Sequence, residues 1–253
     1  MLLFQTPPST PYDLRFTIAR IPVRVHPLFW LIAILFGSAS SDVFQLLIWV
    51  LVVFVSILAH ELGHAFAMRS FGQASQIVLH FGGGLTIPES GWWGGRSVNV
   101  ALSPNQQIFI SLAGPGAGFL LAGLVIAGVT ASGGSIATIW LFGLIPFPML
   151  AAMPIGGRIL SALVTMLLWV NVFWGLVNLT PVYPLDGGHV ARYLFLKADP
   201  WDGVRKSLWL SVIAGVVVAA LGLLFLKSLY MALLFGLLAF QSYQSLQGRA
   251  GGF

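Results

Sequence analysis

Residues 57–70 read ILAHELGHAFAMRS, and they point to both the fold class and the chemistry of this chain. The segment 43–68 contains three ionisable residues, His60, Glu61 and His64. Its other residues are apolar, small or uncharged, and the segment exceeds the roughly 20 residues that a transmembrane helix needs. Ionisable side chains are costly at membrane depth, so they are expected to have a partner or a function there.

The composition is that of a polytopic membrane protein. Of 253 residues, 58% are hydrophobic and only 8% are charged, whereas a soluble domain carries about 25% charged residues. A soluble protein with so few charges could not cover its own surface. The net charge of +5 does not indicate nucleic-acid binding, because the twelve Lys and Arg are scattered beside apolar segments.

Cysteine is absent from the chain. Its absence excludes disulfides, thiolate metal ligands and a cysteine nucleophile. Any metal would therefore be held by histidine and carboxylate side chains.

The pattern of apolar segments predicts an all-α polytopic membrane protein with about six transmembrane helices. They are expected at about 27–38, 43–69, 106–129, 158–178, 206–226 and 229–246. The first is short for a span. The whole chain, 1–253, is expected to form one integral-membrane domain with its catalytic core at about 43–195.

Three other stretches have patterns of their own. SQIVLHFGGGLTIPES (75–90) predicts two short strands around Gly82–Gly84, a membrane-associated β-hairpin. The alternating stretch 15–27 predicts a further short strand. Residues 136–153 are apolar but broken by Pro146 and Pro148, which predicts a re-entrant or partly spanning element.

The basic residues predict the orientation in the membrane. With the N-terminus in the cytoplasm and 136–153 not crossing, ten of the twelve Lys and Arg are cytoplasmic, and only Arg158 and Lys227 lie outside. If 136–153 crossed fully, every later loop would change sides and the bias would weaken. The chain is therefore expected to be a multi-pass protein of a prokaryotic cell membrane, with its N-terminus and active-site opening on the cytoplasmic side.

The HELGH motif is typical of a metal site. On a helix, His60 and His64 share one face and can bind one ion, and Glu61 can take a proton from a bound water. A chain of this composition contains the pattern by chance roughly once in a thousand cases. The plainer alternative is two histidines packed inside a helix bundle, but a dication would neutralise this cluster better.

A catalytic zinc ion also needs a third protein ligand. The pattern HExxHxxGxxH is absent, since Ala67 and Ser70 stand at its last two positions, and Glu89 lies in a Gly-rich loop. Four aspartates are interpreted as solvent-facing loop residues: Asp13, Asp42, Asp199 and Asp202.

Asp186, in PLDGGH directly after the fourth apolar segment, is the better candidate. His60 lies nine residues before Arg69, about 13 Å of helix rise from the expected cytoplasmic boundary. Asp186 can reach that depth if the Pro-rich segment 178–184 dips inward, which buried or cavity-lining backbone can do. Taken alone, LDGG is more typical of an ordinary turn followed by a helix N-terminus than of a metal ligand.

Together these motifs resemble the site-2 protease family of intramembrane zinc metalloproteases (peptidase family M50). The specific pieces are HELGH at 60–64 and NLTPVYPLDGGHV at 178–190, supported by IPVRVHPLFW at 21–30, FGGG at 81–84 and AGPGAGF at 113–119. The similarity extends from about residue 15 to about residue 195.

The resemblance implies one Zn²⁺ held by His60, His64 and Asp186, with Glu61 as general base and Asn178 helping to position the substrate or transition state. It implies hydrolysis of peptide bonds in transmembrane protein substrates, as in regulated intramembrane proteolysis. Many members carry PDZ or CBS domains, and none is expected here, because the loops are short.

Several interpretations stay open at the level of sequence. The hairpin could hold an unwound substrate by β-addition or act as a simple tether. Gly114 and Gly118 have the GxxxG spacing of close helix packing. His189 could support the site or be an ordinary helix residue, and His26 and His80 are interpreted as structural.

The alternatives to a protease are a transporter or ion channel with a His/Glu relay, or a non-proteolytic metal-binding membrane protein.

Overall fold

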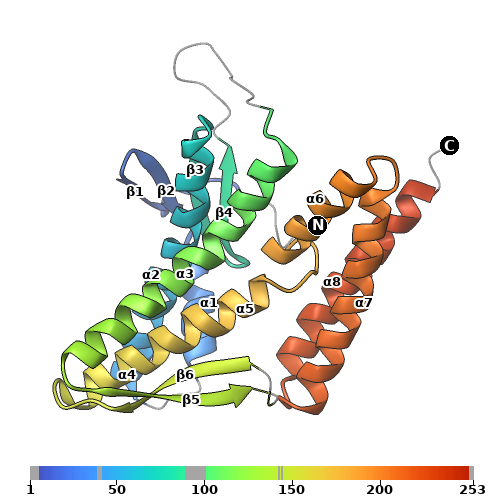
Figure 1. Cartoon of the computed structure of the whole chain (residues 1–253). Coiled ribbons are helices and arrows are strands. Elements are labelled where there is room, and N and C mark those ends of the chain that lie inside the picture. Colours follow the sequence, from blue (N-terminus) through green and yellow to red (C-terminus); the bar gives the residue numbers. More distant parts are fainter. Residues whose placement is uncertain (1–5, 39–41, 89–100, 142, 144, 251–253) are drawn as a thin grey trace. The chain divides into compact units, whose positions relative to one another are not determined.

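The computed structural model describes residues 6–38, 42–88, 101–141, 143 and 145–250 (Figure 1). Its contacts divide the described chain into two compact units. We call residues 2–100 with 113–175 the N-terminal unit, and residues 101–112 with 176–253 the C-terminal unit. Glu89 lies outside the described residues.

The N-terminal unit is built on helix α2, Val43–Ser70, which carries HELGH. Asp42 caps its first turn, since the carboxylate accepts a hydrogen bond from the Phe44 N–H at 2.9 Å. The preceding helix, α1, spans Pro27–Gly37 and begins with a proline, which suits a position whose N–H needs no helical partner. Helix α3 spans Pro104–Ala131 and begins in the C-terminal unit.

A further apolar segment runs through three consecutive helical pieces. They are α4, Gly157–Leu168, the π-helical turn η2, Trp169–Phe173, and α5, Trp174–Asn178. Asn171, inside the π-helical turn, donates to Ser56 Oγ at 2.9 Å and to the Leu167 carbonyl at 2.9 Å. This buried contact joins η2 to α2 one turn before His60.

A four-stranded sheet packs beside α2. Its strands are β1, Leu14–Ile18, β2, Ile21–Val25, β3, Ser75–His80, and β4, Gly83–Pro88, in the order β1-β2-β3-β4. The two hairpins join through β2 and β3, which run parallel. The hydrophobic core between sheet and helices contains Val23, Val25, Ile77, Leu79, Phe29, Leu58 and Ala65.

The predicted hairpin at 75–90 is confirmed as β3–β4, and the predicted strand near the N-terminus is a complete second hairpin. The two-residue turn at Ala19–Arg20 contains neither Gly nor Asn, so the sequence carries no hairpin signal there. Both residues nevertheless have positive φ, 48° and 66°, the backbone that a two-residue hairpin turn requires.

Residues 136–153 form a β-hairpin and not the re-entrant or partly spanning element expected. Its strands are β5, Ser135–Leu141, and β6, Ile145–Ala152. A short apolar run cannot be assigned to helix or strand by periodicity alone. Both prolines fall in β6, which tolerates them because each strand of a two-stranded sheet has a free edge. Since lipid does not tolerate open sheet edges, we infer that this hairpin does not span.

The C-terminal unit is helical. It contains α6, Asp186–Ala198, α7, Gly203–Leu224, and α8, Leu229–Ala250. A Cβ at Gly215 would lie 2.9 Å from the Ala239 Cβ, and one at Gly222 would lie 2.8 Å from the Met231 Cβ. The small residues therefore let α7 and α8 pack closely, as membrane helices commonly do.

The mainly helical membrane fold is confirmed. Among the described residues, five helices are long and apolar enough to cross a membrane, in the ranges 43–70, 104–131, 157–178, 203–224 and 229–248. The sixth expected segment is α1, whose 11 residues fall short of a span. The count of six therefore holds for apolar helices, with five of spanning length.

Candidate active site

The two histidines of HELGH face one another on α2. His60 Nε2 and His64 Nε2 lie 3.1 Å apart, and the ring centroids are 4.8 Å apart. His64 is buried and His60 is half-buried. The i, i+4 spacing thus directs two imidazole nitrogens toward one point, as a shared metal ion requires.

Gly114 of α3 leaves the space that these rings occupy. A Cβ at this position would meet the His64 ring and would lie 2.8 Å from His60 Nε2. A Cβ at Gly63, on α2, would collide with the Ala113 carbonyl, so α2 and α3 are in close contact here. The residues of this site fit a zinc ion, because two imidazole nitrogens converge where the neighbouring helix has no side chain.

Glu61 is held by the sheet. Its side chain is buried, with 5% of the residue exposed. The Thr86 hydroxyl of β4 lies 2.7 Å from Glu61 Oε2 and 3.0 Å from the Glu61 carbonyl. Gly84 is close to the same carboxyl, and a Cβ there would overlap it. Strand β4 therefore fixes the direction of the carboxyl group.

Asp186 and Asn178 belong to the C-terminal unit. Asp186 is the first residue of α6, directly after Leu185 as N-cap, and Asn178 is the buried last residue of α5. A Cβ at Gly187 would overlap the Leu179 carbonyl, and one at Gly188 would lie 2.5 Å from the Tyr183 backbone N. The two glycines let the 179–185 loop pack onto the first turn of α6. This packing fixes the position of Asp186 at the start of the helix.

The remaining histidines have structural contacts. The His26 ring accepts a hydrogen bond from the Leu28 N–H at 3.2 Å and caps α1. The His80 ring accepts from the Gly82 N–H at 3.1 Å in the β3–β4 turn. The His189 ring packs against Tyr183, with centroids 5.0 Å apart, and the guanidinium of Arg192 lies 3.8 Å from the Tyr183 ring centroid.

Asp13 differs from the solvent-facing residue expected. Its side chain has no exposed surface and accepts hydrogen bonds from Thr10 and from Arg24, the latter at 3.1 Å. Burial alone would raise the pKa of Asp13, but these hydrogen bonds and the Arg24 charge lower it to about 2. The carboxylate is thus a structural partner of the N-terminal hairpin.

Thr86, Gly84 and Gly114 were not singled out as site residues from the sequence. In the sequence, Gly84 and Gly114 stood out only as parts of FGGG and AGPGAGF, two motifs that resemble those of the family. The GxxxG spacing of Gly114 and Gly118 indicated helix packing. Gly118 does lie beside Asn171, with a Cβ position 3.5 Å from its carbonyl. Gly114 instead makes room for the histidine rings.

A buried His-Glu-x-x-His cluster on a membrane-length helix, with its glutamate held by a sheet, defines the class of membrane-embedded HExxH proteins. Residues 48–221, more than half of the chain, match peptidase family M50. The chain belongs to this family, which confirms the resemblance noted from the sequence.

Two curated relatives are similar over much of the chain. "Zinc metalloprotease MJ0392" of Methanocaldococcus jannaschii is 25% identical over 218 residues, 85% of this chain and 54% of the relative. "Putative zinc metalloprotease sll0528" of Synechocystis sp. is 30% identical over 148 residues, 58% of this chain and 31% of the relative. The chain thus spans about half the length of the first relative and about a third of the second.

The fold is similar to a solved structure. "Site-2 Protease from Methanocaldococcus jannaschii" superposes with a TM-score of 0.56 at 22% identity, over 93% of this chain and 95% of that one. This likeness concerns the arrangement of the chain in space.

Proposed function

We propose that the protein is an intramembrane zinc metalloprotease that hydrolyses peptide bonds in transmembrane segments of other proteins. The observation that carries the proposal is the convergence of His60 and His64, Nε2 to Nε2 at 3.1 Å, beside a glutamate held by Thr86. Membership of peptidase family M50 and the two zinc metalloprotease relatives support it. The transporter and the non-proteolytic alternatives have no comparable support.

His60 and His64 would hold the zinc ion through their Nε2 atoms. When bound, such an ion lowers the pKa of a coordinated water and polarises the scissile carbonyl. Glu61, directed by Thr86, accepts the proton of the attacking water and then delivers it to the leaving amine. Glu61 directly follows His60 in sequence, and its side chain is buried beside the proposed metal site.

We propose Asp186 as the third ligand. It begins α6, and the glycines after it admit the loop that fixes its direction. The match to NLTPVYPLDGGHV, which the family resemblance includes, supports the same role. Asn178, eight residues earlier, would hydrogen-bond the substrate or the transition state.

Strand β4 would receive the substrate. In the sheet order β1-β2-β3-β4 it is the outer strand, and its Thr86 touches Glu61. A transmembrane helix hides its carbonyls, so a segment to be cleaved has to unwind first. An unwound segment could pair with the outer edge of β4 by β-addition and lie along the catalytic glutamate.

The test measures zinc content and cleavage by the purified full chain in detergent, with a panel of single-span substrates. Wild type should hold about one zinc per chain and cut. Glu61→Gln should keep zinc and lose at least about a thousand-fold in rate, since the proton acceptor is gone. Asp186→Asn should lose zinc, and Asp199→Asn, a carboxylate on a surface turn, is its matched control.

Three results would contradict parts of the proposal separately. Absence of zinc in wild type would overturn the metal site. Full activity of Glu61→Gln would overturn the role of the base. Normal zinc content and activity of Asp186→Asn would remove Asp186 from the ligand set while leaving the two histidines in place.

A further inference from the structure

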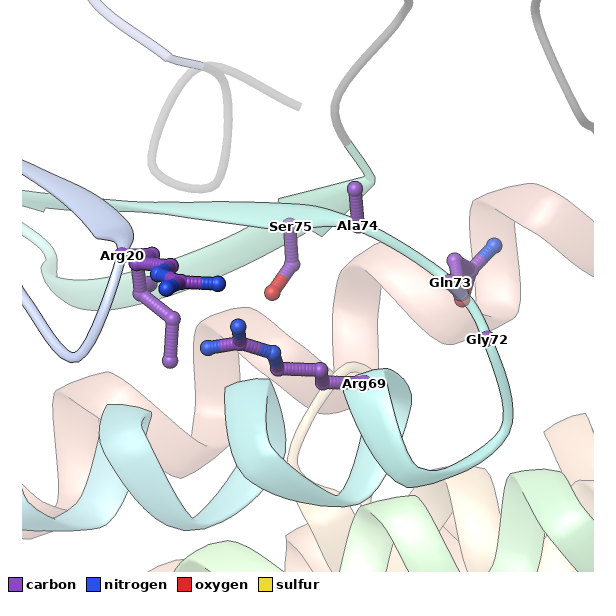
Figure 2. Close-up of a pocket in the computed structure, with 7 residues that line it drawn as sticks. Arg20, Arg69, Gly72, Gln73, Ala74 and Ser75 are labelled. Atoms are coloured by element: carbon purple, nitrogen blue, oxygen red, sulfur yellow. The ribbon is translucent and has the colours of Figure 1, made fainter.

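A second polar site lies at the far end of α2, where the helix leaves its membrane-length segment. A cavity of about 250 Å³ opens between the β1–β2 turn and the α2–β3 turn, both in the N-terminal unit. Arg20, Arg69, Ser75 and the backbone around Gly72–Ala74 line it (Figure 2). Arg69 lies nine residues after His60, about 13 Å along the helix, so this cavity is separate from the HELGH cluster.

The cavity is positively charged, and none of the described residues that line it carries a negative charge. Neither Arg20 nor Arg69 forms an ion pair within the ranges that the structure describes, and no carboxylate is among the residues lining the cavity. Arg15 and Arg24, on the neighbouring strands, are both paired with Asp13. Two guanidinium groups therefore face one cavity without an acidic partner among the described residues.

A buried hydroxyl group points into the same space. Ser75 is 5% exposed, and its Oγ makes no hydrogen bond to any described residue. Figure 2 shows this oxygen directed toward the guanidinium groups. A buried polar atom without a partner costs about 1–3 kcal/mol and needs an explanation. A bound anion would supply it, because a hydroxyl can donate where guanidinium groups also donate.

The turn that presents Arg20 is strained for its sequence. Ala19 and Arg20 both have left-handed backbone, which costs residues with a side chain about 1–3 kcal/mol each. The Ala19 carbonyl accepts a hydrogen bond from Arg69 Nη1, so the two arginines are linked through this turn. The arrangement keeps Arg20 directed at the cavity.

The end of α2 does not oppose an anion strongly. The last carbonyls of a helix carry partial negative charge, but here they are already occupied. The Met68 carbonyl accepts from the Phe71 and Gln73 N–H groups, and the Arg69 carbonyl accepts from Gly72. Two full positive charges then exceed the remaining half charge of the helix end.

We infer that the cavity formed by Arg20, Arg69 and Ser75 binds a phosphate group. Arginine recognises phosphate through paired N–H donors, and the cavity has room for one phosphate with a small substituent. Because Arg69 ends a membrane-length helix, the phosphate can come from an anionic lipid headgroup or from a soluble phosphate compound. Both sources share this chemistry, and the experiment separates them.

Binding is measured with the full chain purified in a neutral detergent, at constant ionic strength, by titration calorimetry. Inorganic phosphate is one probe, and short-chain phosphatidic acid, compared with phosphatidylcholine, is the other. The substitutions Arg20→Gln, Arg69→Gln and Ser75→Ala test the cavity. Arg15→Gln is the matched control, because its exposed side chain carries the same charge one strand away.

Wild type should bind at least one of the two phosphate probes. Arg20→Gln and Arg69→Gln should weaken binding about 10- to 100-fold, as expected for losing hydrogen bonds to a charged group. Ser75→Ala should weaken it less, and Arg15→Gln should leave it unchanged. Ser75→Asp should abolish binding while keeping both arginines, since its carboxylate would occupy the site.

The two probes identify the source of the phosphate. Phosphatidic acid that displaces phosphate indicates a lipid headgroup, and phosphate binding that the lipid does not displace indicates a soluble compound. Binding of neither probe by wild type would overturn the inference. Equal binding by Arg15→Gln and the cavity variants, all with wild-type circular dichroism, would overturn it as well. Neither result depends on zinc or on proteolysis.

Discussion

At the scale of single residues, the site depends on which positions have a side chain and which do not. Glu61 and Thr86 are 25 residues apart and make a direct contact, while Gly114 leaves space for the rings of His60 and His64. Thr86 aligns the proposed base, and Gly114 leaves room for the proposed metal ligands. We therefore expect different defects when each is replaced.

Replacing Thr86 by Val should leave Glu61 without its hydroxyl donor while keeping the β-branched shape of the side chain. We expect cleavage to slow by about 10- to 100-fold in kcat, the range for losing a hydrogen bond to a charged group. Zinc content and KM should stay near wild type, as measured by metal analysis and steady-state kinetics. Thr86→Ser should recover most of the rate, and a Val variant as fast as wild type would refute the positioning role.

Replacing Gly114 by Ala should turn the histidine rings away from their common point. We expect zinc binding to weaken by about 10- to 100-fold, the usual effect of disturbing the surroundings of metal ligands. Competition with a chelator measures this. Gly116→Ala is the matched control, because no atom lies within 4 Å of its Cβ position and both substitutions favour the helix similarly. Equal zinc affinity in the two variants would contradict this role for Gly114.

At the scale of elements, the four-stranded sheet connects the N-terminal hairpin to Glu61, the proposed general base. Strand β3 is almost entirely buried, and the turn after it is closed by His80, which is 2% exposed. Burial lowers the pKa of His80, and the charges of His26 and Arg24 lower it further. The β3–β4 hairpin is therefore sensitive to protonation of this ring.

The pH dependence follows from the sign of that shift. Because the folded-state pKa of His80 lies below its ordinary value of about 6.5, the neutral ring stabilises the fold above that pH. This contribution is lost as the pH falls below about 6.5 and through the folded-state pKa. Thermal unfolding of wild type should show it between pH 7.5 and 5, and His80→Gln should have a flatter profile. An unchanged slope in the variant would show that other groups cause the dependence.

At the scale of the whole molecule, the distribution of basic residues predicts how the chain crosses the membrane. Residues 135–152 form a β-hairpin, which agrees with a segment that does not cross the membrane. If this segment does not cross, ten Lys and Arg are predicted on the cytoplasmic side and two on the other. The N-terminal loop and the β5–β6 hairpin are then expected on opposite sides.

Single cysteines can test this orientation, because the chain has none of its own. Ser9→Cys and Ser135→Cys place a thiol at two exposed positions. An impermeant maleimide added to intact cells should label Ser135→Cys and leave Ser9→Cys unlabelled until the cells are opened. The reverse pattern would invert the predicted topology, and labelling of both in intact cells would contradict it.

Much of this protein is determined by the sequence alone. Six apolar helices, the β3–β4 hairpin and the HELGH motif were all predictable, because each depends on local periodicity or on residues within one helical turn. Membership of peptidase family M50 could also be anticipated, since HELGH and PLDGGH are short, contiguous patterns.

Only the tertiary structure decided the rest. The β5–β6 hairpin, the joining of two hairpins through β2 and β3, and the contact of Thr86 with Glu61 all require segments distant in sequence to pair in one register. Gly114 and His64 are 50 residues apart, and nothing local shows that the missing Cβ is opposite the histidines. Such contacts depend on how helices and strands pack, and packing is a property of the assembled core.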